Sequence, residues 1–146
     1  MSSPTSARTF FEQAAQQLEK AVRERVQLDY PDTNGVRLRD SLKSVERQVM
    51  ARGGKKLDGT PFVPDERLHK PTPVPPCFQN VWFAFWELDR TRPNAGFGPM
   101  PITFTELKSW CELMGEPLDR GDIQVLGRLD RAYLDEASKK LDSDRA

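Results

Sequence analysis

Residues 78–88 read FQNVWFAFWEL, the densest run of large apolar side chains in the chain. Five of these eleven residues are aromatic. Spacings of three and four residues predict a helix with one apolar face made of Phe78, Val81, Trp82, Phe85 and Leu88. Phe83 and Trp86 flank that face and widen it. Such a helix must be buried or must bind a partner, because each large side chain moved out of water contributes roughly 1.5–3 kcal/mol.

The composition favours one small domain with part of the chain outside any core. The 146 residues include 30% charged and only 37% hydrophobic residues, with twelve prolines. The formal net charge is zero, and residues 77–146 are mildly acidic, with nine basic and twelve acidic side chains. A nucleic-acid binder needs a basic surface, so we do not expect nucleic acid as a partner.

The N-terminal region predicts two amphipathic helices. The first covers about residues 5–28, and Ser3-Pro4 supplies a cap followed by a proline at the first helical position. The second covers about residues 37–52 and is stopped by Gly53-Gly54. A short turn joins them, which favours an antiparallel hairpin of residues 1–52. The sequence leaves open whether this hairpin packs on the C-terminal half.

Residues 53–76 are interpreted as an extended linker. They contain three glycines and six prolines, a composition that predicts neither a helix nor a strand ladder. The linker is either a spacer or a PxxP ligand for an aromatic groove. His69 lies within it, where we expect no orienting partner.

Two further helices are predicted after a turn rich in glycine and proline. Phe97 in this turn either covers the aromatic helix as a lid or anchors a partner, and both interpretations stay open. Thr103 and Glu106 form a capping box for a helix that ends at Gly115. The last predicted helix is capped by Asp119 or Asp122, and its apolar face extends as far as Leu134. We expect this helix to fray by Ser143.

The expected fold is therefore all-α. It comprises an N-terminal helical hairpin (1–52), a proline-rich linker (53–76) and a C-terminal three-helix domain with a charged tail (77–146). We expect no membrane span and no signal peptide, and hence a soluble, cytoplasmic protein.

The sequence offers little for catalysis. It has one histidine and two cysteines, Cys77 and Cys111, which we expect to be buried or half-buried free thiols rather than a disulfide. No metal set, cofactor motif or nucleophile beside a base is evident, so we predict no enzyme, no metal and no cofactor. The two C-terminal helices also permit a helix-turn-helix DNA reader, with Gln124, Arg128 and Arg131 on the second helix, but neighbouring carboxylates argue against it.

The C-terminal half resembles a family of small bacteriophage proteins, the tail assembly chaperones of long-tailed phages. The resemblance covers roughly residues 78–135 and rests on Trp86-Glu87-Leu88, Arg92, Gly96 to Ile102, Thr105-Glu106-Leu107 and Leu129 to Leu134. One departure is residues 118–122, where related sequences have a proline-tryptophan-glutamate step. The hairpin and the linker are not accounted for by the resemblance.

The resemblance implies a non-enzymatic assembly factor in the host cytoplasm that binds the tape measure protein and recruits tail tube protein. A homo-oligomer is left open, and a structural virion component is the alternative function. From the residues themselves, the expected apolar contact set is Trp82, Trp86, Phe97 and Trp110, with Arg90 and Arg92 as orienting charges. Plain core packing remains the alternative for the tryptophans. We expect Arg92→Ala to leave the fold intact and to weaken partner capture.

Overall fold

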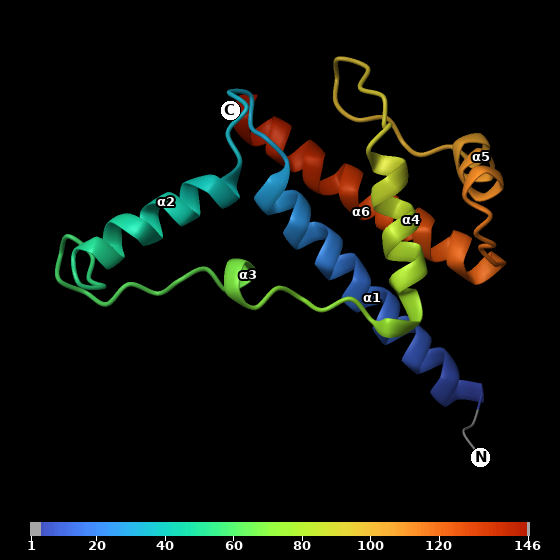
Figure 1. The fold of residues 1–146 in the computed structure, drawn as a ribbon, viewed down its shortest axis with the longest axis horizontal. Coiled ribbons are helices and arrows are strands. Elements are labelled where there is room, and N and C mark those ends of the chain that lie inside the picture. Colours follow the sequence, from blue (N-terminus) through green and yellow to red (C-terminus); the bar gives the residue numbers. More distant parts are fainter. Residues whose placement is uncertain (1–3, 146) are drawn as a thin grey trace.

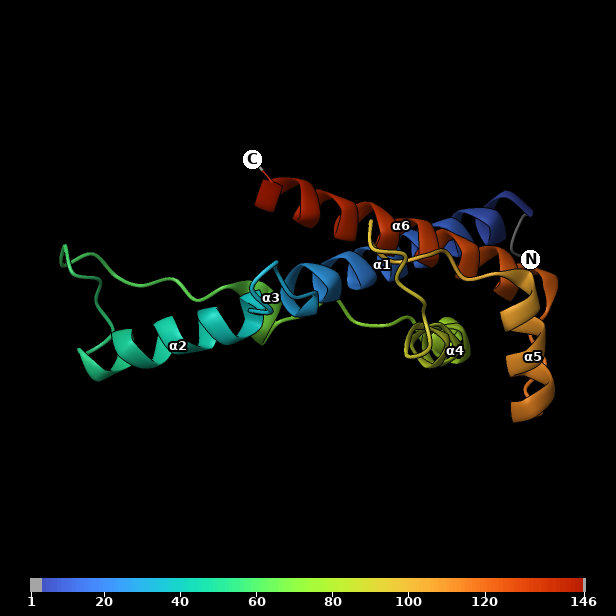
Figure 2. The ribbon, with the colours of Figure 1, turned by 90° about the horizontal axis from the view of Figure 1, so that it is seen from above.

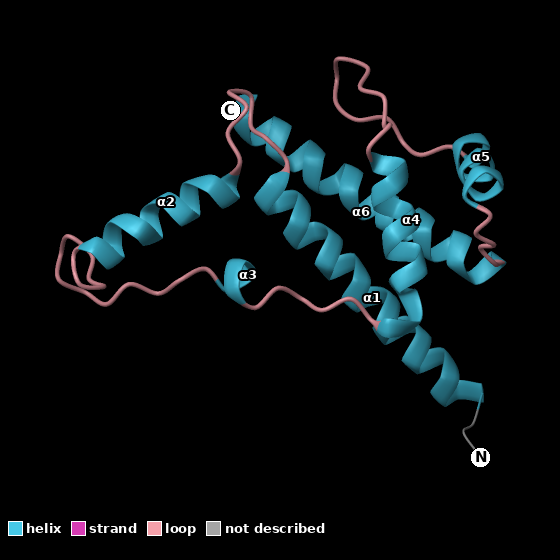
Figure 3. Cartoon of the chain, viewed as in Figure 1, coloured by secondary structure: helices cyan, strands magenta, loops and turns pink. Residues whose placement is uncertain are grey.

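The computed structural model describes residues 4–145, with side chains from Ser6 onward, and it confirms an all-α fold (Figures 1 and 3). The described residues contain no strand, only two isolated β-bridges. The elements in chain order are α1 (Pro4–Asp29), α2 (Leu38–Ala51), α3 (Glu66–His69), the 3-10 turn η1 (Pro76–Phe78), α4 (Gln79–Asp89), α5 (Phe104–Met114) and α6 (Arg120–Arg145). Ser3, the predicted cap of the first helix, lies outside the described residues.

The two longest helices, α1 and α6, lie side by side and run in the same direction (Figure 1). Near their N-terminal ends Arg128 pairs with Glu12, and near their C-terminal ends the Lys140 ammonium donates to the carbonyl of Gln27. Between these two polar contacts, α1 packs its apolar face against α6. The buried residues of this face are Ala14, Ala15, Leu18, Val22 and Val26. The parallel arrangement is possible because the long connection through α2, α3, α4 and α5 returns the chain to the N-terminal end of α1 before α6 begins.

Helix α4 crosses this pair and completes the core. In Figure 2 it is seen end-on while α1 and α6 run across the view. Its fully or largely buried residues are Val81, Ala84, Phe85 and Leu88. Of the two expectations for this helix, burial holds for the face centred on Ala84 and Phe85. Trp82 and Trp86 lie half-buried at its margin, and Phe83 is 51% exposed.

The predicted signals at both ends of α5 and at the start of α6 are confirmed. Thr103 accepts a hydrogen bond from the Glu106 amide while the Glu106 carboxylate accepts from the Thr103 amide. Gly115 ends α5 in the left-handed conformation, with φ of 65°. Asp119 and Asp122 act together at the start of α6, each accepting from the backbone amide of the other.

Helix α6 continues to Arg145, two residues past Ser143, by which it was expected to fray. Its last turns are held by α1 and by the turn after it. Lys140 donates to the carbonyl of Tyr30 as well as to that of Gln27, and Asp144 accepts from the Thr33 amide. These long-range hydrogen bonds stabilise the helical conformation of a charged segment that its local sequence predicts to fray.

Helix α2 and the segment that returns from it form an arm that extends away from the body (Figures 1 and 2). The sequence left open whether the N-terminal hairpin packs on the C-terminal half. Helix α1 does so, because it shares the central core, whereas α2 contacts mainly α1. The hydrophobic core crosses the expected boundary between residues 1–52 and 77–146. Whether either part folds by itself stays a prediction.

The expected linker is more ordered than its composition indicates. It contains the one-turn helix α3, which was not predicted and which Asp65 caps by accepting from the Arg67 amide. It also follows α1, where Thr72 donates to Glu24 and Gln17 donates to the carbonyl of Pro73. Extended proline-rich backbone has unpaired carbonyl groups, so a polar helix face can bind it along its length.

Two smaller expectations are corrected. His69 has a partner, since its Nε2 lies 2.7 Å from Glu46 Oε1 on α2. Cys77 is exposed rather than buried, because it lies on the outer side of the 3-10 turn, whereas Cys111 is half-buried. Both thiols are free. Among the described residues, no helix is long and apolar enough to cross a membrane.

Candidate functional site

The first candidate site is a groove of about 560 Å³ between α4 and α5, called here the α4–α5 groove. Its walls are formed by Leu88, Thr91, Ser109, Trp110, Leu113 and Met114. Phe83 lies against Trp110 at the edge, with 6.3 Å between the ring centroids. The charged side chains of Glu87, Arg90 and Glu106 line its rim. The groove is therefore apolar inside and of mixed charge outside.

The apolar residues around this groove are strongly exposed. Leu113 is 86% exposed, Phe83 51% and Met114 47%. Helix α5 contributes Leu107 to the core and turns Leu113 and Met114 away from it. This second apolar part of α5 is therefore exposed to solvent. Exposed apolar residues that gather around a groove are typical of a protein-binding surface.

The second candidate site is a cleft of about 690 Å³ between the C-terminal end of α1, the start of α2 and the C-terminal end of α4, called here the arginine cleft. Trp86, Tyr30 and Tyr133 form aromatic parts of its wall. The guanidinium carbon of Arg25 lies 3.9 Å from the Trp86 ring centroid, a cation–π contact. Arg37 lines the same cleft from the start of α2.

Ion pairs occupy the carboxylates of the arginine cleft. Arg39 holds Asp29 in a two-pronged contact of 2.5 and 3.0 Å, and hydrogen bonding to Arg39 lowers the pKa of Asp29. Arg90 pairs with Glu87 at 3.2 Å. Arg25 is exposed as a whole, yet the face of its guanidinium against Trp86 is shielded from water, and this burial lowers its pKa.

The two sites are neighbours. Glu87 and Arg90 line both of them, so the C-terminal end of α4 separates the α4–α5 groove from the arginine cleft. The predicted contact residues divide accordingly. Trp86 belongs to the cleft, Trp110 to the groove and Arg90 to both.

Trp82 lies beside the arginine cleft, 5.9 Å from the Arg25 guanidinium carbon. Phe97 is 89% exposed at the tip of the turn after α4, so it does not cover the aromatic helix as a lid. Of the six predicted residues, Trp86, Arg90 and Trp110 thus line the two neighbouring sites, Trp82 lies beside the cleft, and Phe97 lies apart from both.

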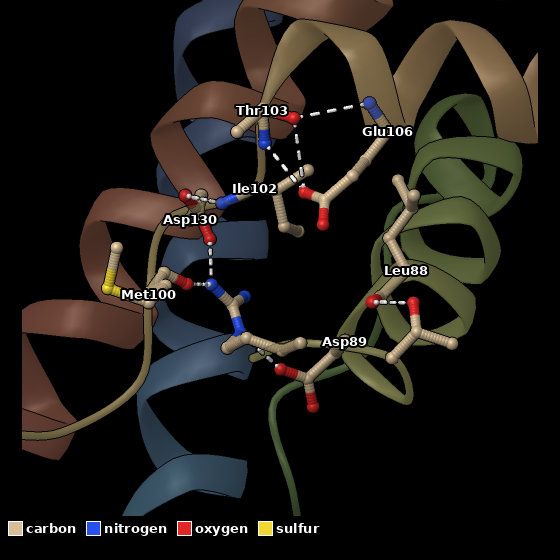
Figure 4. A network of polar contacts seen from close by, with 9 residues as sticks. Leu88, Asp89, Met100, Ile102, Thr103, Glu106 and Asp130 are labelled. Atoms are coloured by element: carbon tan, nitrogen blue, oxygen red, sulfur yellow. Dashed lines mark hydrogen bonds and ion pairs between the residues drawn. The ribbon is translucent and has the colours of Figure 1, made fainter. Parts of the chain in front are cut away.

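Arg92 lies inside the protein, which corrects its prediction as a surface charge for a partner. Its side chain is 3% exposed. The guanidinium group lies among the carboxylates of Asp89 and Asp130 and the carbonyl of Met100, which Figure 4 labels. Arg92 Nε donates to Asp89 at 2.7 Å, while Nη1 donates to the Met100 carbonyl and lies 2.7 Å from Asp130. Burial alone would lower the pKa of Arg92, but the two carboxylates outweigh it and raise that pKa. This arginine fixes the turn after α4 to α6.

Several site residues escaped the sequence analysis. Leu113 and Met114 fall in the predicted helix that ends at Gly115, and only the tertiary structure shows that they meet solvent. Arg25 and Arg37 fall within the two predicted N-terminal helices. No local signal distinguishes them, because the cleft is built from parts of α1, α2, α4 and α6, which only the tertiary structure brings together.

The described residues also bear on two other kinds of site, a metal centre and a DNA-reading helix. Residues 4–145 contain no group of three or more histidine, cysteine, aspartate or glutamate side chains placed to hold a metal ion. Arg128, a candidate for reading DNA, is engaged with Glu12 and Glu19 of α1 at 2.9 and 2.8 Å. It is therefore not presented to a groove of DNA.

The comparisons with known proteins give one match. A family model described as phage tail assembly chaperone matches residues 63–135, which is half of the chain. The matched segment includes α3, α4, α5 and the first part of α6, and so contains the whole α4–α5 groove. No curated protein and no solved structure matches.

Proposed function

Because the chain belongs to the phage tail assembly chaperone family, we propose that its α4–α5 groove binds an amphipathic helix of a tail protein during assembly. The tape measure protein is the first candidate partner, and the tail tube protein is the second. The proposed role is to hold the partner in a soluble form in the host cytoplasm, and it requires no chemical step.

The observation that carries this proposal is the exposed apolar lining of the groove. Leu113 and Met114 line the groove and are 86% and 47% exposed, and Phe83, which packs against Trp110 beside them, is 51% exposed. Fully burying a side chain of this size contributes roughly 1.5–3 kcal/mol. An amphipathic helix supplies apolar side chains at three- and four-residue spacing, which suits a groove between two helices.

The mixed-charge rim fits a partner that must later be released. Glu87 and Arg90 form an exposed ion pair, with Arg90 75% exposed, and Glu106 lies nearby on α5. Charges of this kind influence orientation and the association rate more than the final affinity. A chaperone that leaves before the tail matures needs such moderate binding.

The test is co-purification of the tape measure protein with wild-type chain and with Leu113→Glu. Leu113 is 86% exposed, so the substitution leaves the core intact and puts a charge into the groove. We expect loss of co-purification by at least about tenfold, since one buried charge opposes the apolar contact. Leu57→Glu is the matched control, because Leu57 is 88% exposed in the arm and should not affect capture.

Equal capture by wild type and Leu113→Glu would contradict the use of this groove. The chaperone role makes a second prediction, that the protein is missing from mature particles. Stoichiometric amounts in purified virions, detected by mass spectrometry, would instead assign it to the tail structure.

A further inference from the structure

We propose that the arginine cleft is a second binding site, which takes an acidic peptide segment of a partner protein. The inference is independent of the α4–α5 groove, because it rests on different side chains and on charge rather than on apolar area. The two sites meet only at Glu87 and Arg90.

The argument starts from which charges in the cleft are already paired. The carboxylate of Asp29 is bound by Arg39, that of Glu87 by Arg90, and that of Asp89 by the buried Arg92. Every carboxylate that lines the cleft therefore has its own arginine. Among the described residues, Arg25 and Arg37 form no ion pair and their side chains donate no hydrogen bond. Two guanidinium groups thus remain for a ligand.

The position of Arg25 prepares it for a carboxylate. Its guanidinium stacks on Trp86 at 3.9 Å, which shields one face and leaves the N–H groups along the edge free. A planar guanidinium held in this way forms a two-pronged contact with a carboxylate without losing further side-chain freedom. Asp29 and Asp89 attract Arg25 from a distance but do not bind it directly.

The cleft favours a peptide over a nucleic acid. Only Arg25 and Arg37 are unpaired, so the cleft can bind one or two carboxylates but has too few free cations for the repeated charges of a phosphate chain. Tyr30, Trp86 and Tyr133 add aromatic surface for a side chain that neighbours the acidic residue. A volume of about 690 Å³ accommodates a few side chains of such a segment.

The experiment measures binding of two labelled probes to the full-length chain by fluorescence anisotropy. One is a 12-residue peptide of alternating glutamate and leucine, and the other replaces every glutamate with glutamine. We expect the glutamate peptide to bind about tenfold more tightly. Arg25→Gln and Arg37→Gln should each weaken its binding about tenfold, whereas the exposed Arg120→Gln at the far end of α6 should not change it.

Three outcomes overturn the proposal. The first is equal affinity for the two peptides, and the second is unchanged binding in both arginine variants. The third is a 20-nucleotide single strand that competes with the peptide and shows the same dependence on Arg25 and Arg37, because it would assign the cleft to phosphate groups. Because Arg37 is exposed, Arg37→Gln should not disturb the fold, and it tests the proposal even if Arg25→Gln does.

Leu113→Glu separates this site from the proposed chaperone groove. It should abolish capture of the tape measure protein and leave binding of the glutamate peptide unchanged. If it abolishes both, the peptide occupies the α4–α5 groove and the arginine cleft is not a separate site. Failure of tape measure capture in wild type would concern the proposed function alone.

Discussion

Arg90 and Arg92 show how little a residue's local sequence says about its role. Each follows an acidic residue by three positions and pairs with it, Arg90 with Glu87 and Arg92 with Asp89. Yet the side chain of Arg90 is 75% exposed and that of Arg92 is 3% exposed. The difference arises from Asp130 on α6, which approaches Arg92 from far along the chain.

Arg92→Ala should destabilise the protein, contrary to the expectation from sequence. It would leave Asp130, 6% exposed, with a buried and unpaired charge, and would free the Met100 carbonyl. Removing one partner of a buried ion pair costs about 3–5 kcal/mol. Urea unfolding followed by circular dichroism measures this loss directly.

Arg90→Ala is the matched control for that measurement. Its ion pair with Glu87 is exposed, and exposed pairs contribute about 0–1 kcal/mol. We expect an unfolding midpoint close to that of wild type. If the two variants lose the same stability, Arg92 is not the buried tie between the turn and α6.

At the level of elements, α5 depends on its capping box. Thr103→Ala removes the acceptor for the Glu106 amide and should cost about 1 kcal/mol of stability. Thr105→Ala, in the first turn of the same helix but without a capping role, serves as the control. A lower unfolding midpoint in Thr103→Ala alone supports the assignment, and equal midpoints in both variants would refute it.

The pairing of α1 with α6 should respond to acid. The pKa of Glu12 is lowered by its hydrogen bond to Arg128, and the pKa of Asp135 by its hydrogen bond to Arg23. A carboxyl group with a lowered pKa stabilises the fold above its ordinary pKa of about 4, and this contribution disappears as pH falls further.

The melting temperature should therefore decline below about pH 4. In the double variant Glu12→Gln, Asp135→Asn this decline should be shallower, because the groups that take up protons are missing. Circular dichroism melts between pH 2 and pH 7 compare the two proteins. Identical pH profiles would show that these ion pairs contribute nothing to the pairing of the helices.

For the whole molecule, the core is shared by segments from both ends of the chain. Leu18 and Val22 of α1 are fully buried with Phe85 of α4 and Leu129 of α6. Without α1, the apolar faces of α4 and α6 would meet water, at roughly 25 cal/mol per Å² of apolar surface. The segment matched by the family model contains no part of α1.

A fragment of residues 77–146 should accordingly fail to unfold cooperatively. Its thermal melt should be broad, and addition of a peptide covering residues 4–30 should restore a sharp transition with increased helical signal. The full-length chain provides the reference melt. A sharp transition in the fragment alone would show that the C-terminal part is an independent domain, as the sequence-based division supposes.

The sequence by itself determined the five longer helices and most of their ends, although it missed the one-turn helix α3. The capping box at Thr103, the stop at Gly115 and the buried aromatic helix were all predictable, because each depends on hydrogen bonds or spacing within a few residues. The family resemblance over the C-terminal half was likewise evident from local motifs and agrees with the match to residues 63–135.

Only the tertiary structure decided which faces of these helices are covered. The parallel pairing of α1 with α6, the burial of Arg92 and the exposure of Leu113 depend on contacts between residues far apart in sequence. The physical reason is that an apolar spacing defines a face but not its neighbour. Whether a face is buried depends on the surface that packs against it. For α1 that surface is provided largely by α6, at the opposite end of the chain.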